Sequence, residues 1–463
     1  MEKTSGDCPV GYEEPLAEMK PENIDSHDIK GLRLILRALR HRNYRLFFGG
    51  QSISLIGTWM QRIAMGWLVY RLTNSAFLLG LVSFLGLIPT FLLAPMAGVL
   101  ADRWNRHRIL VVTQSAAMIQ ALILAALVLT DKVTIWHIVP LSIFLGVINA
   151  ADMPARQAFV LDMVIKKEDL SNAIALNSSV FNSARLLGPS VAGLLIAVTG
   201  EGVCFLINGI SYLAVIVALL AMKITPKKAE IPEGPVWQRI KEGFDYAFGF
   251  APIRAILLLL AQVSLIGLPY TVLMPVFARD ILHGGPHILG FLMGATGVGA
   301  LGGALYLASR RSVVGLERWI ALAVGILGGG LLAFALSRVF WLSSLLMLST
   351  GFGMMVAIAS SNTILQTIVE DDKRGRVMSF YTMALMGMAP FGSLLAGGLA
   401  SEIGASHTLM ISGVLCLLGS LVFASQLSAL RARIHPIYLR AGIIPEVASA
   451  IRVASEPGIK ARL

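Results

Sequence analysis

The sequence predicts an all-α membrane protein with twelve transmembrane helices, arranged as two pseudo-symmetric bundles of six. Three observations predict this class. The 463 residues are 56% hydrophobic and only 14% charged, with a mean hydropathy of +0.74, whereas soluble domains carry roughly 25% charged residues. The chain contains twelve long apolar runs, and its basic residues gather on alternate connectors between them. Lipid must therefore solvate most of the folded chain.

The apolar runs have the length that a bilayer requires, since a hydrocarbon core of about 30 Å needs roughly 20 residues of helix. They lie at residues 46–70, 76–100, 109–130, 134–159, 170–198, 203–222, 256–277, 288–308, 319–336, 342–366, 375–400 and 408–427. Prolines inside these runs, such as Pro189 and Pro390, do not reduce the count, because neighbouring helices satisfy the backbone groups that a proline frees.

The distribution of Lys and Arg predicts how the chain is oriented. Of the 38 basic residues, 32 lie on the side that holds both termini and four lie on the other side. Connectors rich in Lys and Arg stay in the cytoplasm, so we expect both termini to be cytoplasmic and the protein to lie in a bacterial-type plasma (inner) membrane. The net charge of +11 is then a topology signal, and nucleic acid is not an expected partner.

The connectors also divide the chain into domains, because the longest internal one is polar and basic and separates six spans from six. Short segments repeat between the halves: LLGPSVAGLL at 186–195 is similar to MAPFGSLLAGGL at 388–399, and SAFLLGLV at 75–82 to PHILGFLM at 286–293. Related halves with a site between them are typical of alternating-access transporters. The predicted domains are a disordered cytoplasmic tail (1–28), an amphipathic basic segment (29–45), an N-terminal bundle (46–222), a linker containing a short helix (223–252), a C-terminal bundle (253–428) and a basic cytoplasmic tail (429–463). The amphipathic segment is predicted either as a helix in the membrane plane or as a basic flank of the first span.

The connector after the second span carries a motif, GVLADRWNRHRIL at 98–110. Gly98 permits close helix packing, Asp102 can cap a neighbouring helix, and Arg106 follows Asp102 by one turn. With Arg103, these residues resemble the major facilitator signature G-x-x-x-D-R-x-G-R-[RK]. The resemblance implies the major facilitator fold and a cytoplasmic gate at this loop.

Three further segments refine the resemblance. LNSSVFNSARLLGPSVAG at 176–193 resembles the GPxxG antiporter signature through Gly188 and Pro189, which we assign to gating. With NAADMPARQAF at 149–159 and SLIGTWMQRIAMGW at 54–67, the chain is similar to the branch that holds macrolide-type drug exporters and the enterobactin exporter. Asn105 departs from the family's glycine in the first motif, but Asn tolerates left-handed geometry, so the turn survives.

The fourth span contains an acid, Asp152, with Arg156 four residues later. An acid at this position resembles the family's partner of the signature arginine. We therefore assign Asp152 and Arg156 to the gate with Asp102 and Arg106, and a proton-carrying role for Asp152 is the alternative.

An arginine in the middle of the fifth span predicts the substrate site. Burying the guanidinium of Arg185 at a helix centre costs at least about 2.5–3.5 kcal/mol, so this side chain should face a water-filled cavity, unless carbonyls at a packed junction satisfy it. Asn177 and Phe181 share its helix face at spacings of four. The complete predicted binding set is Arg185, Arg62, Asn177, Phe181, Gln61, Thr58, Asn149 and Tyr381.

What the spans lack shapes the predicted function. No Asp or Glu occupies the middle of a span, which favours anionic or hydrogen-bonding cargo over cations. No P-loop is present, and neither a metal site nor another cofactor is expected. We predict a secondary active transporter, not an enzyme, that acts as a monomer and exports an amphipathic, anionic or polar, siderophore-like small molecule by alternating access, with proton antiport as one way to drive it. The alternatives are an exporter of macrolide-like drugs and a non-transporting membrane scaffold or sensor.

Overall fold

The computed structural model describes residues 36–164, 167–222, 236–310, 312–440 and 443, and over these residues the chain is helical with connecting turns. Eleven of the described helices are long and apolar enough to cross a membrane. A further long helix, α2 (Arg42–Thr73), runs beside them but is too polar to belong to that set. The predicted all-α membrane class is confirmed.

The first half of the molecule, called here the N half, consists of α2, α3 (Ala76–Arg103), α4 (Arg106–Leu129), α5 (Ile135–Met163), α6 (Lys167–Thr199) and α7 (Glu201–Leu220). Within it α2 packs on α7 and α6, α3 packs on α5, and α4 packs on α7 and α5. Part of the polar surface of α2 is buried against these neighbours, through Gln51, Ser54 and Gln61, which helps a helix of low hydropathy to occupy this place.

The second half, called the C half, contains two spans that are interrupted by π-helical turns. One comprises α9 (Ala251–Gln262), η2 (Val263–Gly267), α10 (Tyr270–Val276) and η3 (Phe277–Ile281). The other comprises α14 (Asp371–Thr382), η4 (Met383–Gly387) and α15 (Ala389–Ile403). The remaining helices are α11 (Pro286–Ser309), α12 (Leu316–Leu336), α13 (Phe340–Ile368) and α16 (Ala405–Ser425), with the short α8 (Val236–Gly249) before the half and α17 (Leu427–Arg440) after it. π-Turns occur mostly as single-turn bulges and often at functional sites.

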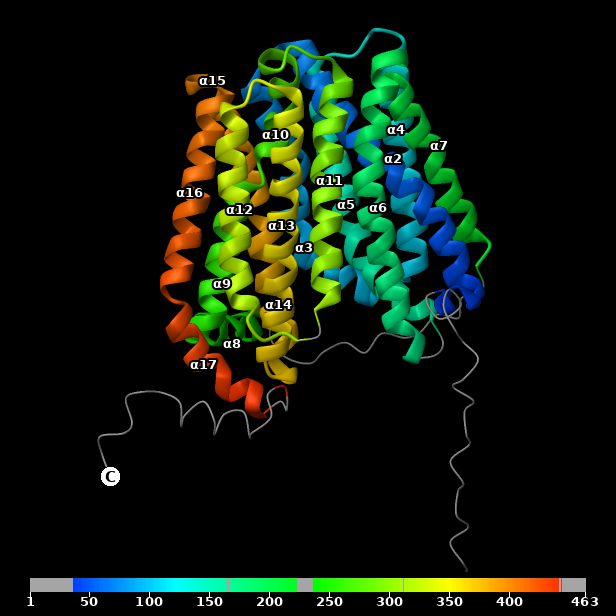
Figure 1. Cartoon of the computed structure of the whole chain (residues 1–463). Helices are drawn as coiled ribbons and strands as arrows, with labels where there is room; N and C mark the ends of the chain where they lie inside the picture. The colour runs from blue at the N-terminus through cyan, green and yellow to red at the C-terminus, as the bar shows by residue number, and fades with distance from the viewer. Residues whose placement is uncertain (1–35, 165–166, 223–235, 311, 441–442, 444–463) are drawn as a thin grey trace, which may run out of the picture.

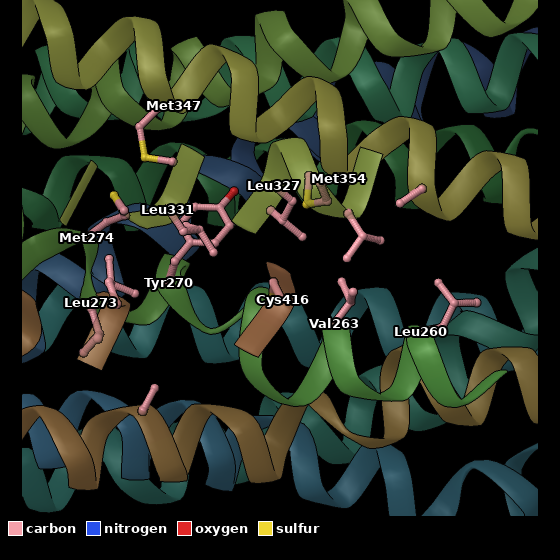
Figure 2. Close-up of a cluster of buried hydrophobic side chains, with 14 of the residues drawn as sticks. Leu260, Val263, Tyr270, Leu273, Met274, Leu327, Leu331, Met347, Met354 and Cys416 are labelled. Atoms are coloured by element: carbon pink, nitrogen blue, oxygen red, sulfur yellow. The ribbon is translucent and has the colours of Figure 1, made fainter. Parts of the chain in front are cut away.

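The core of the C half is apolar and closely packed. Figure 2 shows side chains from several helices of the half converging on one cluster, among them Val263, Leu327 and Cys416, which are all fully buried. Tyr270 and Met354 belong to the same cluster and are also labelled in Figure 2. The close packing makes the interior of the C half rigid, and the surface that faces the N half rests on this interior.

The two halves touch mainly through two helix pairs, α6 with α11 and α3 with α15 (Figure 1). At each crossing two glycines face each other: a Cβ added to Gly193 would lie 2.7 Å from the Cα of Gly290, and one added to Gly80 would lie 2.8 Å from the Cα of Gly397. All four glycines fall inside the segments that repeat between the halves. The two crossings are therefore related by the pseudo-symmetry that the repeats indicate.

The ends of the molecule differ in what they carry. The start of α2, α8 and α17 lie at one end, at the bottom of Figure 1, which we call the termini side; the other end is called the opposite side. The connector helix predicted within 223–252 is present as α8.

The two basic flanks are described only in part. Within 29–45, η1 (Arg37–Arg40) is a single 3₁₀ turn, after which α2 begins, so the prediction that remains for this segment is a basic flank of the first span. This turn is bound to the N half because the buried carboxylate of Asp169 pairs with Arg37, Arg40 and His41. Residues 429–440, predicted as part of a tail, instead continue α17, whose Arg431 pairs with Glu317 at 2.6 Å. The predicted tail at 1–28 lies outside the described residues.

Candidate substrate cleft between the halves

The halves are joined by polar contacts on the opposite side. The hydroxyl of Tyr70 at the end of α2 donates to the carboxylate of Asp280 in η3, and Nη1 of Arg279 donates to Oδ1 of Asn74 at 2.7 Å. Between described residues, no hydrogen bond or ion pair joins the two halves on the termini side. The molecule is therefore closed on the opposite side.

At mid-depth, α2 carries an arginine at the open region between α2, α6 and the C half, which we call the cleft. Arg62 lies deep among the helices, yet its side chain is exposed. Its Cζ sits 4.7 Å from the centre of the Trp59 ring, and that ring meets Phe181 of α6 edge to face, with centroids 5.8 Å apart. Since 46% of Phe181 is exposed, the cleft offers an aromatic surface directly beside a positive charge.

A second arginine comes from α6. The half-buried side chain of Arg185 reaches across to the C half, where its Nη2 lies 3.4 Å from Sδ of Met354. Tyr270 is close enough to interact with it electrostatically, and Arg185 in turn is close enough to Arg62 for the two cations to repel each other. Two guanidinium groups therefore share one region of the cleft.

Neither guanidinium is neutralised by the protein that the structure describes. The ion pairs between described residues include neither Arg62 nor Arg185. A thioether is only a weak acceptor, and an aromatic ring attracts the cation without occupying its N–H groups, so most of the five donors on each guanidinium have no acceptor among the described residues. The chemistry that suits this arrangement is binding of anionic groups.

A small polar cavity lies inside the N half. It has a volume of about 30 Å³, enough for a water molecule, and its lining includes Thr58, Asn149, Asp152 and Arg156. Only 1% of Asp152 is exposed. Its Oδ1 accepts from Oγ1 of Thr113 at 2.9 Å and from the side-chain amide of Gln114. Its Oδ2 pairs with Arg156. The buried carboxylate is thus fully compensated.

The remaining predicted binding residues do not all reach the cleft. Asn177 is half-buried one turn below Phe181 on α6. Gln61 is buried in a polar network, where it donates to Oε1 of Gln120 at 3.1 Å and accepts from Asn208 at 2.6 Å, so it holds helices together rather than facing cargo. Tyr381 is also buried, and its hydroxyl donates to the carbonyl of Ile358. Packing against neighbouring helices turns the side chains of Gln61 and Tyr381 inward. Their positions along the helices do not reveal this direction.

The gate is arranged differently from the prediction. Nη1 of Arg106 pairs at 3.1 Å with Asp162, not with Asp152. Ten helical residues separate the two acids, which places Asp152 about 15 Å deeper along α5. Arg156 pairs with Asp152 rather than with the loop. The helix α3 includes the positions of Gly98, Asp102 and Arg103, but their side chains lie outside the description, so their gating role stays a prediction.

The GPxxG segment lies where α6 meets two helices at once. A Cβ added to Gly188 would lie 2.5 Å from Cβ of Trp59 in α2, and one added to Gly290 of α11 would lie 2.8 Å from the carbonyl oxygen of Pro189. The segment therefore brings α6 close to its own half on one face and to the other half on the next face. Its predicted gating role remains a prediction.

Several residues of the site carry no clear sequence signal. Trp59 is one turn from Arg62, and the spacing of three could have identified it as a partner. The contact of Tyr70 with Asp280 joins residues far apart in the chain, and only the fold brings them together. Asp162 lies beyond the predicted end of the fourth span at 159, and the sequence analysis did not single it out.

An all-helical membrane bundle of two similar halves around a charged cleft is the architecture of a transporter, not of an enzyme. The chain belongs to the major facilitator transporters of the family described as transmembrane secretion effectors, whose profile matches residues 35–437.

Individual relatives agree with this family. The chain is 28% identical to the staphyloferrin A transporter of Staphylococcus aureus, over 82% of this chain and 95% of the relative. It is 25% identical to macrolide efflux protein A of Streptococcus pyogenes, over 81% of this chain and 95% of the relative. Among solved structures, a bacterial homologue of the human lysosomal transporter Spinster aligns with a TM-score of 0.65 at 12% identity, covering 83% of this chain and 96% of that one, which shows the shared fold.

Proposed function

We propose that this transporter exports an amphipathic, anionic or polar small molecule of the siderophore kind by alternating access. One observation carries the proposal: Arg62 and Arg185 lie together in the cleft without a carboxylate partner among the described residues, beside the rings of Trp59 and Phe181. An anion with an apolar surface complements both features. The similarity to a staphyloferrin A transporter supports this choice.

We further propose that the protein lies in the plasma membrane as a monomer, with the termini side in the cytoplasm. The support is the excess of Lys and Arg on that side. The closed opposite side is then external, and the cleft receives cargo from the cytoplasm.

For energy coupling we propose proton antiport with Asp152 as the carrier. This carboxylate is buried and compensated by Arg156, and Thr58 borders its cavity. Thr58 is also one helical turn from Arg62, so the cavity and the cleft share a wall on α2. A change of charge at Asp152 therefore alters the electrostatic potential in the cleft close to the cargo.

The experiment uses purified protein in liposomes with an acidic lumen, and enterobactin in an external medium of about pH 9, where its catechol groups ionise and make it an anionic probe. We expect uptake driven by the pH gradient. Arg185→Lys should weaken enterobactin binding because the forked contact is lost while the charge stays, and Arg185→Gln should weaken it more. A neutral analogue should be little affected. Equal loss for both ligands would make Arg185 structural and remove the argument for anionic cargo.

The coupling is tested separately. Asp152→Asn should leave enterobactin binding within about threefold of the wild type but abolish uptake against a concentration gradient, because the carrier can no longer exchange its proton. Facilitated exchange of labelled for unlabelled enterobactin should persist. Gradient-driven uptake by Asp152→Asn would exclude Asp152 as the carrier.

An exporter of macrolide-like drugs is the second candidate, favoured by the exposed Trp59–Phe181 surface and by the macrolide efflux relative. Erythromycin carries a basic amine, which the two arginines repel. Competition by erythromycin against enterobactin would favour this candidate.

A further inference from the structure

We infer that the cleft is built for a dianion, with one anionic group bound to each of Arg62 and Arg185. This inference rests on the proposed function, because it specifies the charge of the cargo at the same site. It goes beyond a general preference for anions, since it fixes the number of negative charges and their division between two helices.

The first step is electrostatic. The two guanidinium groups are close enough to repel each other, and no ion pair of the described residues neutralises either one. A monoanion would leave one charge uncompensated in a region where charge is costly. A dianion neutralises both guanidinium charges, because each arginine attracts one of its two anionic groups.

The second step concerns how each arginine is held. Arg62 lies over the Trp59 ring at 4.7 Å, and Arg185 touches the thioether of Met354 at 3.4 Å. These contacts come from different helices and restrain the two side chains independently. Each guanidinium keeps a free edge for bidentate binding of one carboxylate or phenolate group, so the two groups of a dianion need not compete for one fork.

The third step concerns the part of the cargo between its charges. Trp59 and Phe181 meet edge to face at 5.8 Å, and 46% of Phe181 is exposed. Trp59 is in contact with Arg62, and Phe181 lies one turn from Arg185 on α6. The aromatic pair therefore bridges the two arginines, and the spacer of the dianion should be apolar and planar.

The test uses three probes of the same shape and different charge: isophthalate, which is a dianion, 3-carbamoylbenzoate, which is a monoanion, and neutral isophthalamide. Binding to purified full-length protein is measured by calorimetry. Because a hydrogen-bonded contact to a charged group strengthens binding by about ten- to a hundredfold, isophthalate should bind at least about tenfold more tightly than 3-carbamoylbenzoate. Arg62→Gln and Arg185→Gln should each abolish that ratio.

A matched control is Arg45→Gln, which removes an exposed arginine from the termini end of the same helix α2. This variant should keep the isophthalate preference of the wild type. Arg62→Lys and Arg185→Lys should keep the preference in part while lowering affinity, which separates the loss of charge from any loss of fold.

The outcomes separate this inference from the proposed function. Equal binding of isophthalate and 3-carbamoylbenzoate, with both lost in the Gln variants, would overturn the dianion and leave an anionic cargo in place. Binding of all three probes with equal affinity, or of none, would overturn both.

Discussion

The closure of the opposite side should depend on the hydroxyl of Tyr70. In Tyr70→Phe the ring remains, so Arg279 keeps its contact with that ring at 5.8 Å and its hydrogen bond to Asn74. Only the bond to Asp280 is lost. A hydrogen bond to a charged group contributes about 1.5–3 kcal/mol, and because Asp280 is exposed, water replaces part of it. We therefore expect the lower end, an increase of about tenfold in the ratio of opposite-open to opposite-closed molecules.

The assay is a distance measurement by double electron–electron resonance between spin labels at positions 136 and 341, in a background without the native cysteines. Trp136 and Trp341 are 82% and 79% exposed. They begin α5 and α13 on the opposite side and belong to different halves. The fraction of molecules at the longer distance should rise in Tyr70→Phe.

Tyr44→Phe is the matched control. It removes a hydroxyl from the other end of α2, where Tyr44 donates to the carbonyl of Ala173 within the N half. It should leave the distance distribution unchanged. An unchanged distribution in Tyr70→Phe, or the same shift in both variants, would refute the argument that this contact holds the halves together.

Three further substitutions test other parts of the structure. Gly193→Ala places a Cβ 2.7 Å from the Cα of Gly290, so it should disfavour the closed opposite side by about 1–3 kcal/mol. The spin labels at positions 136 and 341 measure this change. An unchanged distance distribution would contradict the close approach of the two helices. Asp162→Asn breaks a partly buried pair with Arg106 inside the N half, so it should lower the thermal midpoint only slightly, since such a pair contributes about 0–1 kcal/mol. A large drop would show that this pair carries more of the stability. Asp169→Asn should weaken the binding of the η1 turn to the N half by about 1–3 kcal/mol. The released turn should be cleaved faster by protease before α2. Protection equal to the wild type would show that other contacts hold η1.

The sequence predicted the fold class well because the signals for a membrane bundle are local. Apolar length and the placement of Lys and Arg are properties of one span or one connector at a time. The prediction that Arg185 faces a cavity also rests on a local cost, that of a charge at a helix centre, and it stays a prediction for a side chain that the structure shows half-buried.

The parts that could not be predicted depend on contacts between distant segments. Gln61 and Arg62 are adjacent in the chain, yet one is buried in a network with Asn208 and the other lines the cleft. Similarly, Asp152 and Asp162 lie on one helix, and only the position of α4 decides which of them meets Arg106. The π-turns carry no compositional signal because ordinary apolar residues form them.

The low hydropathy of α2 has a consequence for how the protein is made. This helix precedes the other helices of the N half in the chain, yet it carries Arg62 near its middle, and an arginine there opposes insertion by about 2.5–3.5 kcal/mol. Its largest packing partner is α7, the last helix of the N half to be synthesised. Gln61 of α2 accepts a hydrogen bond from Asn208 of α7, and that contact can form only after α7 has been made. The packing of α2 within the N half is thus completed only when the whole half has been translated.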